Sequence, residues 1–359
     1  YSGPFVKALS QTGSSVIAKK YDGTNGLKVG YKTYIDDISQ NICGEYQELI
    51  GILCEAAALF KKVVADANSL KLSPKSCIVA SSLKLAKAIA KELNDNHKII
   101  VRFDRSNRDL GILFTAAKTR DRSSLKARYK KGIKRNFRVG KLAKVTRNAK
   151  KLFNTGTYAQ ATWGHECAGF TKQEVMGLRR MCATACGVNQ ANKCLTSTIA
   201  FCLSPRKDPD MRILSDITKL WFTTAPTLFQ DHSTDLAYAW SQACKFIKVN
   251  GKVIISNVYG LMGNMIYTLY SIGWDPVDIS HWKDCKGKVH LTPVHEPFPS
   301  HLVIYAMQND LEAIHWKKAS FHYNGEGLQD GVDFPSTVKE LSKFRKAKDW
   351  GKAAALETL

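Results

Sequence analysis

Negative charge is scarce in this sequence. Its 359 residues include 31 aspartates and glutamates against 53 lysines and arginines, which gives a formal net charge of +22. So large an excess of one sign makes the chain repel itself, and it indicates a polyanionic partner such as nucleic acid. The apolar fraction of 44% excludes a disordered chain and is sufficient for packed cores in two or three domains.

Paired cysteines are also missing. None of the ten cysteines belongs to a Cys-x-x-Cys pair, and their spacing does not form the disulfide framework of a small secreted domain. Residues 1–26 are rich in Gly, Ser, Lys and Thr and contain no recognisable secretory or transit leader. We therefore expect reduced thiols and an intracellular protein, either nuclear or cytoplasmic.

Long hydrophobic runs are absent as well. Only Val258–Trp274 is largely apolar, and polar residues such as Asn264 and Thr268 interrupt it. Its apolar positions recur at helical spacing, at Leu261, Met265, Ile266, Leu269 and Ile272. The pattern predicts a buried amphipathic helix, with no transmembrane span and no membrane partner.

Residues 27–42 carry the clearest local pattern. Apolar and polar residues alternate on both sides of Asp36 and Asp37, which predicts a β-hairpin with two carboxylates at its tip and an apolar face for packing. By strand parity, Asp36 belongs to the polar face with Tyr34 and Lys32. Two carboxylates on a rigid turn are suitable oxygen ligands for Mg²⁺, but aspartate is also common in solvated turns. Both interpretations stay open on this pattern alone.

The residues that follow alternate between helical and strand patterns. We expect helices at 45–70 and 83–93, strands at 77–80, 99–103 and 110–114, and a polar turn at 104–109. This order predicts an α+β domain in which helices cover one face of a small sheet.

The positive charge is concentrated between Lys118 and Lys151. Fifteen lysines and arginines stand there against Asp121 alone, a local charge of +14 out of the total of +22. Apolar residues at four-residue spacing predict helices with one buried stripe, formed by Leu125, Tyr129, Ile133 and Phe137 and continued by Leu142, Val145, Ala149 and Leu152. A solvated face is the usual explanation of charged residues, but near-uniform positive charge fits contact with phosphates better.

Several motifs in this order resemble the reverse transcriptases of non-LTR retrotransposons. Tyr34-Ile35-Asp36-Asp37 resembles the catalytic turn of the polymerase palm, and the LKLSPKS run at Leu70–Ser76 resembles the palm motif that follows it. Asp109–Ile112 is similar to the Leu-Gly turn that grips the primer end. Three later segments resemble the region after the palm: Trp163–Phe170, Leu178–Met181 and Gly260–Pro276. The resemblance is closest over residues 27–200 and weaker over residues 201–280.

This resemblance implies an RNA-directed DNA polymerase, a nucleotidyltransferase that uses two Mg²⁺ ions. Asp36 and Asp37 would be catalytic metal ligands, and Lys75 would neutralise or protonate the departing pyrophosphate, unless it is an ordinary solvated lysine. Leu110 and Gly111 would contact the primer. The implied partners are an RNA template, a DNA primer or RNA–DNA hybrid, and deoxynucleotide triphosphates. The basic segment would be the thumb, with phosphate contacts from Lys126, Lys130, Lys134, Arg135, Arg138, Lys141 and Lys144.

The palm of this family also needs a metal-binding aspartate on an earlier strand and a Gly-rich motif, and residues 1–26 contain neither. We therefore expect the C-terminal part of a polymerase, inactive by itself. The expected α+β fold comprises a partial palm at 1–118, a basic helical thumb-like domain at 119–203 and an α/β extension of unknown role at 204–359. The alternative is a catalytically dead remnant that binds nucleic acid without sequence preference. The upstream sequence distinguishes the two hypotheses.

Two further clusters contain residue types that bind metals. Cys182, Cys186, Cys194 and Cys202 could hold zinc, but their spacing favours small residues of a helical core. His281, His290, His295 and His301 lack a ligand spacing, and we expect ordinary loop and strand there.

Overall fold

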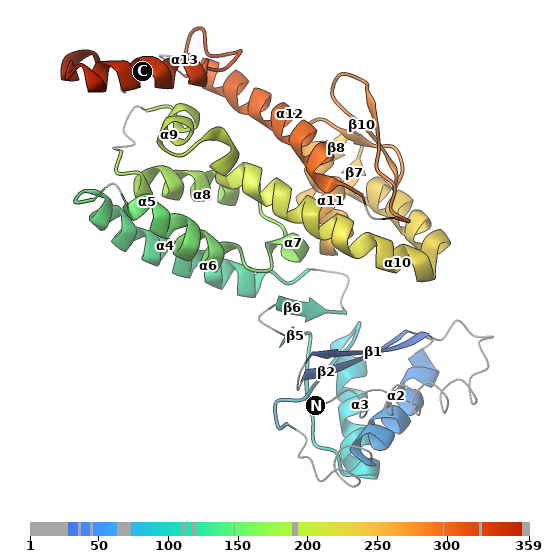
Figure 1. The fold of residues 1–359 in the computed structure, drawn as a ribbon. Coiled ribbons are helices and arrows are strands. Elements are labelled where there is room, and N and C mark those ends of the chain that lie inside the picture. The colour runs from blue at the N-terminus through green and yellow to red at the C-terminus, as the bar shows by residue number, and fades with distance from the viewer. Residues whose placement is uncertain are drawn as a thin grey trace. The chain divides into compact units, whose positions relative to one another are not determined.

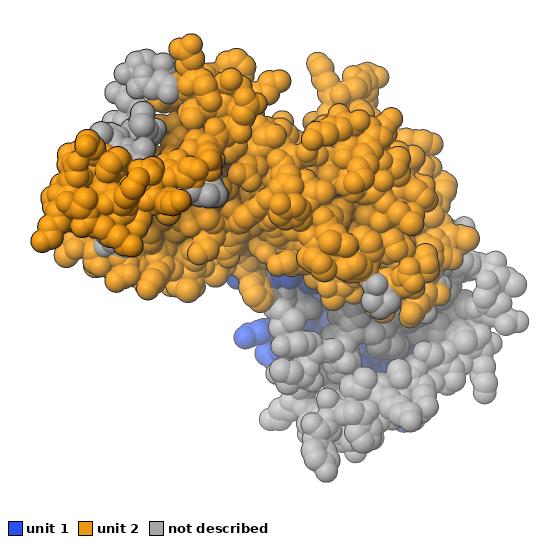
Figure 2. All heavy atoms as spheres, turned by 45° about the horizontal axis from the view of Figure 1, so that its top comes forward, with its two compact units in different colours: residues 1–121 blue, residues 122–359 orange. Residues whose placement is uncertain are grey.

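The protein is described here by a computed structural model that covers residues 28–34, 37–43, 46–62, 73–109, 112–116, 120–146, 148–188, 193–296, 298–322 and 325–353. The chain forms two compact units, residues 1–121 and 122–359, which are coloured separately in Figure 2. The fold is α+β and mainly helical, with short strands in small sheets.

The described part of unit 1 begins with the predicted β-hairpin. Strands β1 (Lys28–Tyr34) and β2 (Asp37–Cys43) pair antiparallel, with Tyr34 opposite Asp37 and Lys28 opposite Cys43. Ile35 and Asp36, which join the two strands, lie outside the described residues. Because residues paired across two strands occupy the same face, position 37 shares its face with position 34. We had expected only Asp36 on that polar face.

In the described residues, the rest of unit 1 consists of two helices and four short strands. A small core forms where the helices pack, around Cys54, Leu85, Ile89, Leu93 and Ile99. Most predicted elements are present with shifted ends, and residues 63–72 lie outside the described part. The elements are α2 (Tyr46–Lys61), β3 (Cys77–Val79), α3 (Leu83–His97), β4 (Arg102–Asp104), β5 (Ser106–Asp109) and β6 (Ile112–Thr115).

Two expectations for unit 1 were wrong. The polar turn predicted at 104–109 contains strand β5, which pairs with β6 so that Asp109 faces Ile112. Within the described residues, the single expected sheet is divided into three two-stranded sheets, β1–β2, β3–β4 and β5–β6. Alternating side chains identify a strand, but the choice of partner depends on how the elements dock, and a short polar strand has no alternation to reveal it.

Unit 2 is mostly helical (Figure 1). Its long helix α10 starts where Asp208 accepts a hydrogen bond from the backbone N–H of Asp210, and where Pro209 occupies the first turn. The elements are α4 (Ser123–Ala143), α5 (Ala149–Leu152), η2 (Phe153–Tyr158), α6 (Ala159–Thr162), α7 (His165–Ala168), α8 (Lys172–Ala185), α9 (Leu195–Cys202), η3 (Pro205–Lys207), α10 (Pro209–Ile247), β7 (Lys248–Val249), β8 (Lys252–Val253), η4 (Ile255–Asn257), α11 (Gly260–Ser271), β9 (Asp275–Pro276), β10 (His281–Lys283), β11 (Val289–Leu291), α12 (Ser300–Ser320) and α13 (Phe334–Lys346).

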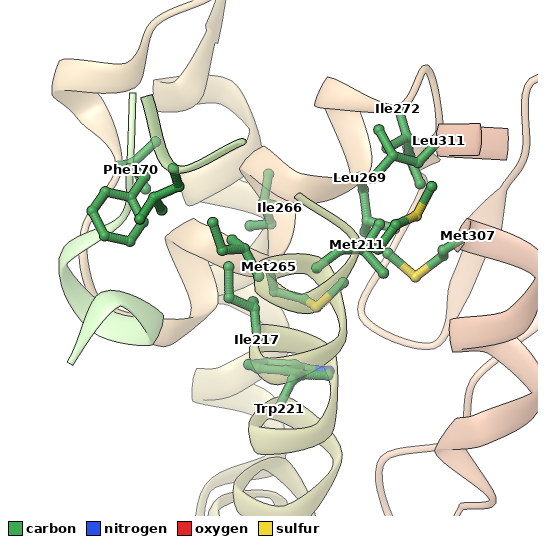
Figure 3. Packing of buried hydrophobic residues seen from close by; sticks show 14 of the residues in the cluster. Phe170, Met211, Ile217, Trp221, Met265, Ile266, Leu269, Ile272, Met307 and Leu311 are labelled. Carbon is green, nitrogen blue, oxygen red and sulfur yellow. The ribbon is translucent and has the colours of Figure 1, made fainter. Parts of the chain in front are cut away.

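A large hydrophobic core joins most of the described helices of unit 2, and a smaller one forms around Ala200, Trp316 and Ala319. Figure 3 shows side chains of α10, α11 and α12 packed against one another, among them Met211, Met265 and Met307. The apolar positions predicted for a buried helix at 258–274 are confirmed, because Met265, Ile266, Leu269 and Ile272 are buried and Leu261 packs against them. Among the described residues, no helix is both long and apolar enough to cross a membrane.

The same core extends across the boundary that we predicted at residues 203/204. It joins Leu125 of α4 and Leu178 of α8 to residues of α10 and α12. A buried ion pair adds to this connection, since Arg179 of α8 donates to both carboxylate oxygens of Asp208 at 3.0 and 2.9 Å. The predicted thumb-like domain and extension therefore belong to one compact unit. That they have separate functions stays a prediction.

Helix α4 approaches α6 closely at Gly132. A Cβ atom at this position would lie 2.7 Å from the Cβ of Ala161, closer than side chains pack. We expect Gly132→Ala to lower the free energy of unfolding by about 1–3 kcal/mol, because overpacking outweighs the better helix propensity of alanine. Urea unfolding of the variant measures this effect.

The matched control is Gly51→Ala in α2, where nothing lies within 4 Å of the added Cβ. This variant is expected to be as stable as the parent or more stable by up to about 1 kcal/mol. If Gly132→Ala were also neutral or stabilising, the close packing of α4 on α6 would be wrong.

Candidate nucleic-acid interface

Helix α4 presents a continuous cationic surface. Its 21 residues include no aspartate or glutamate, and all seven residues predicted to contact phosphates are exposed: Lys126, Lys130, Lys134, Arg135, Arg138, Lys141 and the C-cap residue Lys144. From Lys126 to Lys141 the helix rises by roughly 22 Å, at about 1.5 Å per residue. This length matches about six nucleotide steps of roughly 3.4 Å each.

The buried stripe of α4 differs from the predicted one. Leu125 is buried, but Ile133 is 46% exposed and Phe137 is 64% exposed. Four residues turn an α-helix by about 400°, so a row at four-residue spacing drifts by about 40° per step and leaves the core after two or three steps. The core side of α4 instead follows Leu125, Gly132, Asn136 and Val139.

The continuation of that stripe was mostly wrong too. Ala149 is buried, but Leu142, Val145 and Leu152 are exposed. Apolar side chains therefore lie among the cations on the outer surface of α4 and its C-terminal end.

Polar contacts fix the orientation of α4 on its neighbours. Asn136 donates a buried hydrogen bond to the carbonyl oxygen of Met181, and the Tyr129 hydroxyl donates to the carbonyl oxygen of Glu174. On the other side, Arg128 Nη1 donates to the carbonyl oxygen of Trp163 at 2.9 Å, and Arg135 Nη1 donates to that of Gly156 at 3.1 Å. Arg128 and Arg135 thus support the fold, although Arg135 keeps further donors for a phosphate.

The start of α4 is held by an ion pair with α8. Arg122 donates to the carboxylate of Glu174, which also accepts a hydrogen bond from the backbone N–H of Thr171 in a capping box. Burial by itself would raise the pKa of Glu174, but the hydrogen bonds from Thr171 and Arg122 outweigh it and hold this pKa below its ordinary value. The carboxylate is therefore charged at neutral pH and stabilises the junction of the two helices.

The remaining cations of α4 are available to a ligand. Within the part of the chain that the structure describes, they form no ion pair: Lys126, Lys130, Lys131, Lys134, Arg138, Lys141 and Lys144. Several unpaired positive charges on one face raise the local potential and attract a polyanion.

The predicted catalytic residues of unit 1 are only partly described. Asp37 is the first residue of β2, whereas Asp36, Leu110 and Gly111 lie outside the described residues. Leu110 and Gly111 connect the paired strands β5 and β6. Lys75 is exposed in the turn before β3, where its backbone N–H donates to the Ser73 hydroxyl and its carbonyl oxygen accepts from Arg102.

No group of three or more His, Cys, Asp or Glu side chains suited to a metal ion occurs among the described residues. The Mg²⁺ ligation proposed from the sequence depends on Asp36 and stays a prediction. The hairpin brings position 37 next to position 34, but nothing in the described residues brings Lys75 together with Asp37 as a site.

Two cysteines of the first cluster pack against hydrophobic side chains, and two histidines of the second lie in strands beside aspartates. Cys182 is part of the core of unit 2, and Cys194 packs near Ala200 and Trp316. A hydrogen bond with Cys182, together with burial, raises the pKa of the Cys186 thiol to about 12. His281 and His290 lie in strands β10 and β11, as expected for ordinary strand residues, and contact Asp278 and Asp284.

The sequence pattern assigned Phe137 and Ile133 to the core and missed that both side chains are exposed. The signal that could have shown this was the strict four-residue spacing, because a straight helix needs alternating steps of three and four to keep a stripe buried.

Comparison of the chain with protein-family models, with curated proteins and with solved structures found no match.

Proposed function

We propose that this chain binds nucleic acid along α4, as the template–primer grip of a retroelement reverse transcriptase. The observation that carries the proposal is the exposed face of α4, where seven cations have no carboxylate partner among the described residues. Lysine and arginine side chains on a rigid helix suit the regular spacing of phosphates. Contacts of this kind position a nucleic acid without reading its sequence.

The polymerase part of the proposal rests on the motifs of unit 1. Its support is that β1 and β2 pair on either side of Ile35 and Asp36, with Asp37 as the first residue of β2, and that β5 and β6 pair on either side of Leu110 and Gly111. In this proposal Asp36 and Asp37 ligate Mg²⁺, Lys75 faces the leaving phosphate, and Leu110 and Gly111 contact the primer. Two Mg²⁺ ions would supply the stabilisation of the attacking 3′ oxygen and of the leaving group.

A second candidate function is nucleic-acid binding without catalysis. The observation that favours it is that the described strands of unit 1 form three separate two-stranded sheets, because a polymerase site needs carboxylates held on neighbouring strands of one sheet. Both candidates share the interface on α4 and differ only in unit 1. Both also place the protein inside the cell, in the nucleus or the cytoplasm.

The salt dependence of binding tests the proposed interface. With about six phosphates neutralised, the affinity for an RNA–DNA hybrid is expected to fall by about 10³-fold between 50 and 200 mM salt, because bound cations displace condensed counterions. Fluorescence anisotropy with hybrids of unrelated sequence measures this, and their affinities should agree within a few-fold. An affinity that stays constant with salt, or strong preference for one sequence, would contradict the proposal.

A further inference from the structure

An exposed aromatic ring lies in the middle of the cationic face. Phe137 is 64% exposed, and the ammonium group of Lys141 lies 4.7 Å from the centre of its ring. At about 100° per residue, the cationic and apolar side chains of α4 that fall within roughly 60° of Phe137 around the helix axis are Lys126, Lys130, Ile133, Lys134 and Lys141. The ring therefore has cations on both sides along the helix and one partly exposed apolar neighbour, Ile133.

This placement is not explained by the packing of α4. The core side of the helix is formed by Leu125, Gly132, Asn136 and Val139, and the ring of Phe137 points away from it. A second copy of the chain is a poor occupant, since two surfaces with unpaired cations repel each other at short range. A ligand that satisfies the whole face needs negative charges spaced around a flat apolar surface.

We propose that Phe137 is a stacking platform for an unpaired base, so that α4 prefers nucleic acid with accessible base faces over a fully paired duplex. This inference rests on the proposed function and narrows its ligand to nucleic acid with unpaired bases, such as the single-stranded part of a template–primer. Single-stranded nucleic acid offers both required features, because each base has an apolar face and the linked phosphates reach the flanking lysines. In a duplex the base faces are stacked on one another, and only phosphates, sugars and base edges are accessible.

The test compares Phe137→Ala with the parent chain on two probes of equal length, an unstructured oligothymidine and a blunt DNA duplex. Removal of the ring is expected to weaken binding of the single strand by about tenfold and to leave duplex binding within about twofold. The salt slope on both probes should not change, because no cation is lost. Phe137→Trp should restore the single-strand affinity, and Phe137→Leu should not.

Phe321→Ala is the matched control. This residue is 81% exposed and follows α12, which lies apart from α4 in Figure 1. Its replacement should change neither affinity. The melting temperature of each variant shows that the fold is retained, which is expected because neither ring is buried.

The outcomes separate the inference from the proposed function. Equal loss of affinity on both probes, no loss on either, or full rescue by leucine would overturn the stacking role while the interface on α4 stands. Absence of salt-dependent binding to both probes by the parent chain would overturn the proposed function itself. Binding of anionic vesicles that depends on Phe137, without the difference between the two probes, would also overturn the inference.

Discussion

Replacing Lys130, Lys134 and Arg138 together by alanine is expected to weaken hybrid binding by about 10²-fold at 0.1 M salt. Each of these residues is exposed on α4 and has no ion-pair partner among the described residues. Removal of three phosphate contacts should lower the slope of the logarithm of affinity against the logarithm of salt by about three. Because phosphate contacts do not depend on the base sequence, hybrids of different sequence should lose affinity equally.

The control removes the same charge elsewhere in unit 2. Lys245, Lys252 and Lys286 are exposed, and strands β8 and β10 in that region lie apart from α4 in Figure 1. Their replacement by alanine also lowers the net charge by three, so it measures the effect of charge alone. If the control triple variant lost as much affinity as the α4 variant, binding would depend on the overall charge and the assignment to α4 would fail.

The second large effect is expected from Asp36→Ala. In a polymerase that joins these residues to an upstream palm strand with its own aspartate, this substitution should abolish primer extension with Mg²⁺ and leave hybrid binding within about twofold. A carboxylate repels phosphate unless a cation lies between them, so its loss removes chemistry and not affinity. Primer extension and anisotropy, measured on the same preparation, separate these two effects.

Asp37→Ala should be about as damaging as Asp36→Ala. Strand parity by itself assigns only Asp36 to the polar face, but the pairing of Tyr34 with Asp37 puts position 37 on the same face of the hairpin as position 34. Asp95→Ala, which removes an exposed carboxylate of α3 in the same unit, is the control and should extend primers normally. Normal extension by Asp36→Ala would leave the two aspartates as an ordinary turn and favour the binding module.

Local patterns in the sequence were sufficient for several elements. The period of two around Asp36 and Asp37 predicted the hairpin, because only a strand with two unlike faces satisfies that alternation. The helical spacing at 258–274 predicted the buried helix α11, because apolar residues three and four positions apart lie on one face of a helix. In both cases the pattern is carried by residues that lie close together in the chain.

The concentration of positive charge on α4 was also evident without a structure. No arrangement of the fold could hide so many cations, since burying unpaired charges is far too costly. The exposure of Lys126, Lys130 and Lys134 therefore follows from composition.

Other features depended on contacts between distant segments. Strand β5 has no apolar alternation and exists because β6 pairs with it, and the strands of unit 1 form separate sheets because their partners are chosen by docking. The core of unit 2 crosses residue 203 because α4, α8, α10 and α12 pack together. The position of Phe137 was decided in the same way. Helix α4 packs on α6 at Gly132 and faces the core with Leu125 and Val139, which leaves Phe137 exposed among the lysines, and the spacing of its apolar residues alone did not predict this.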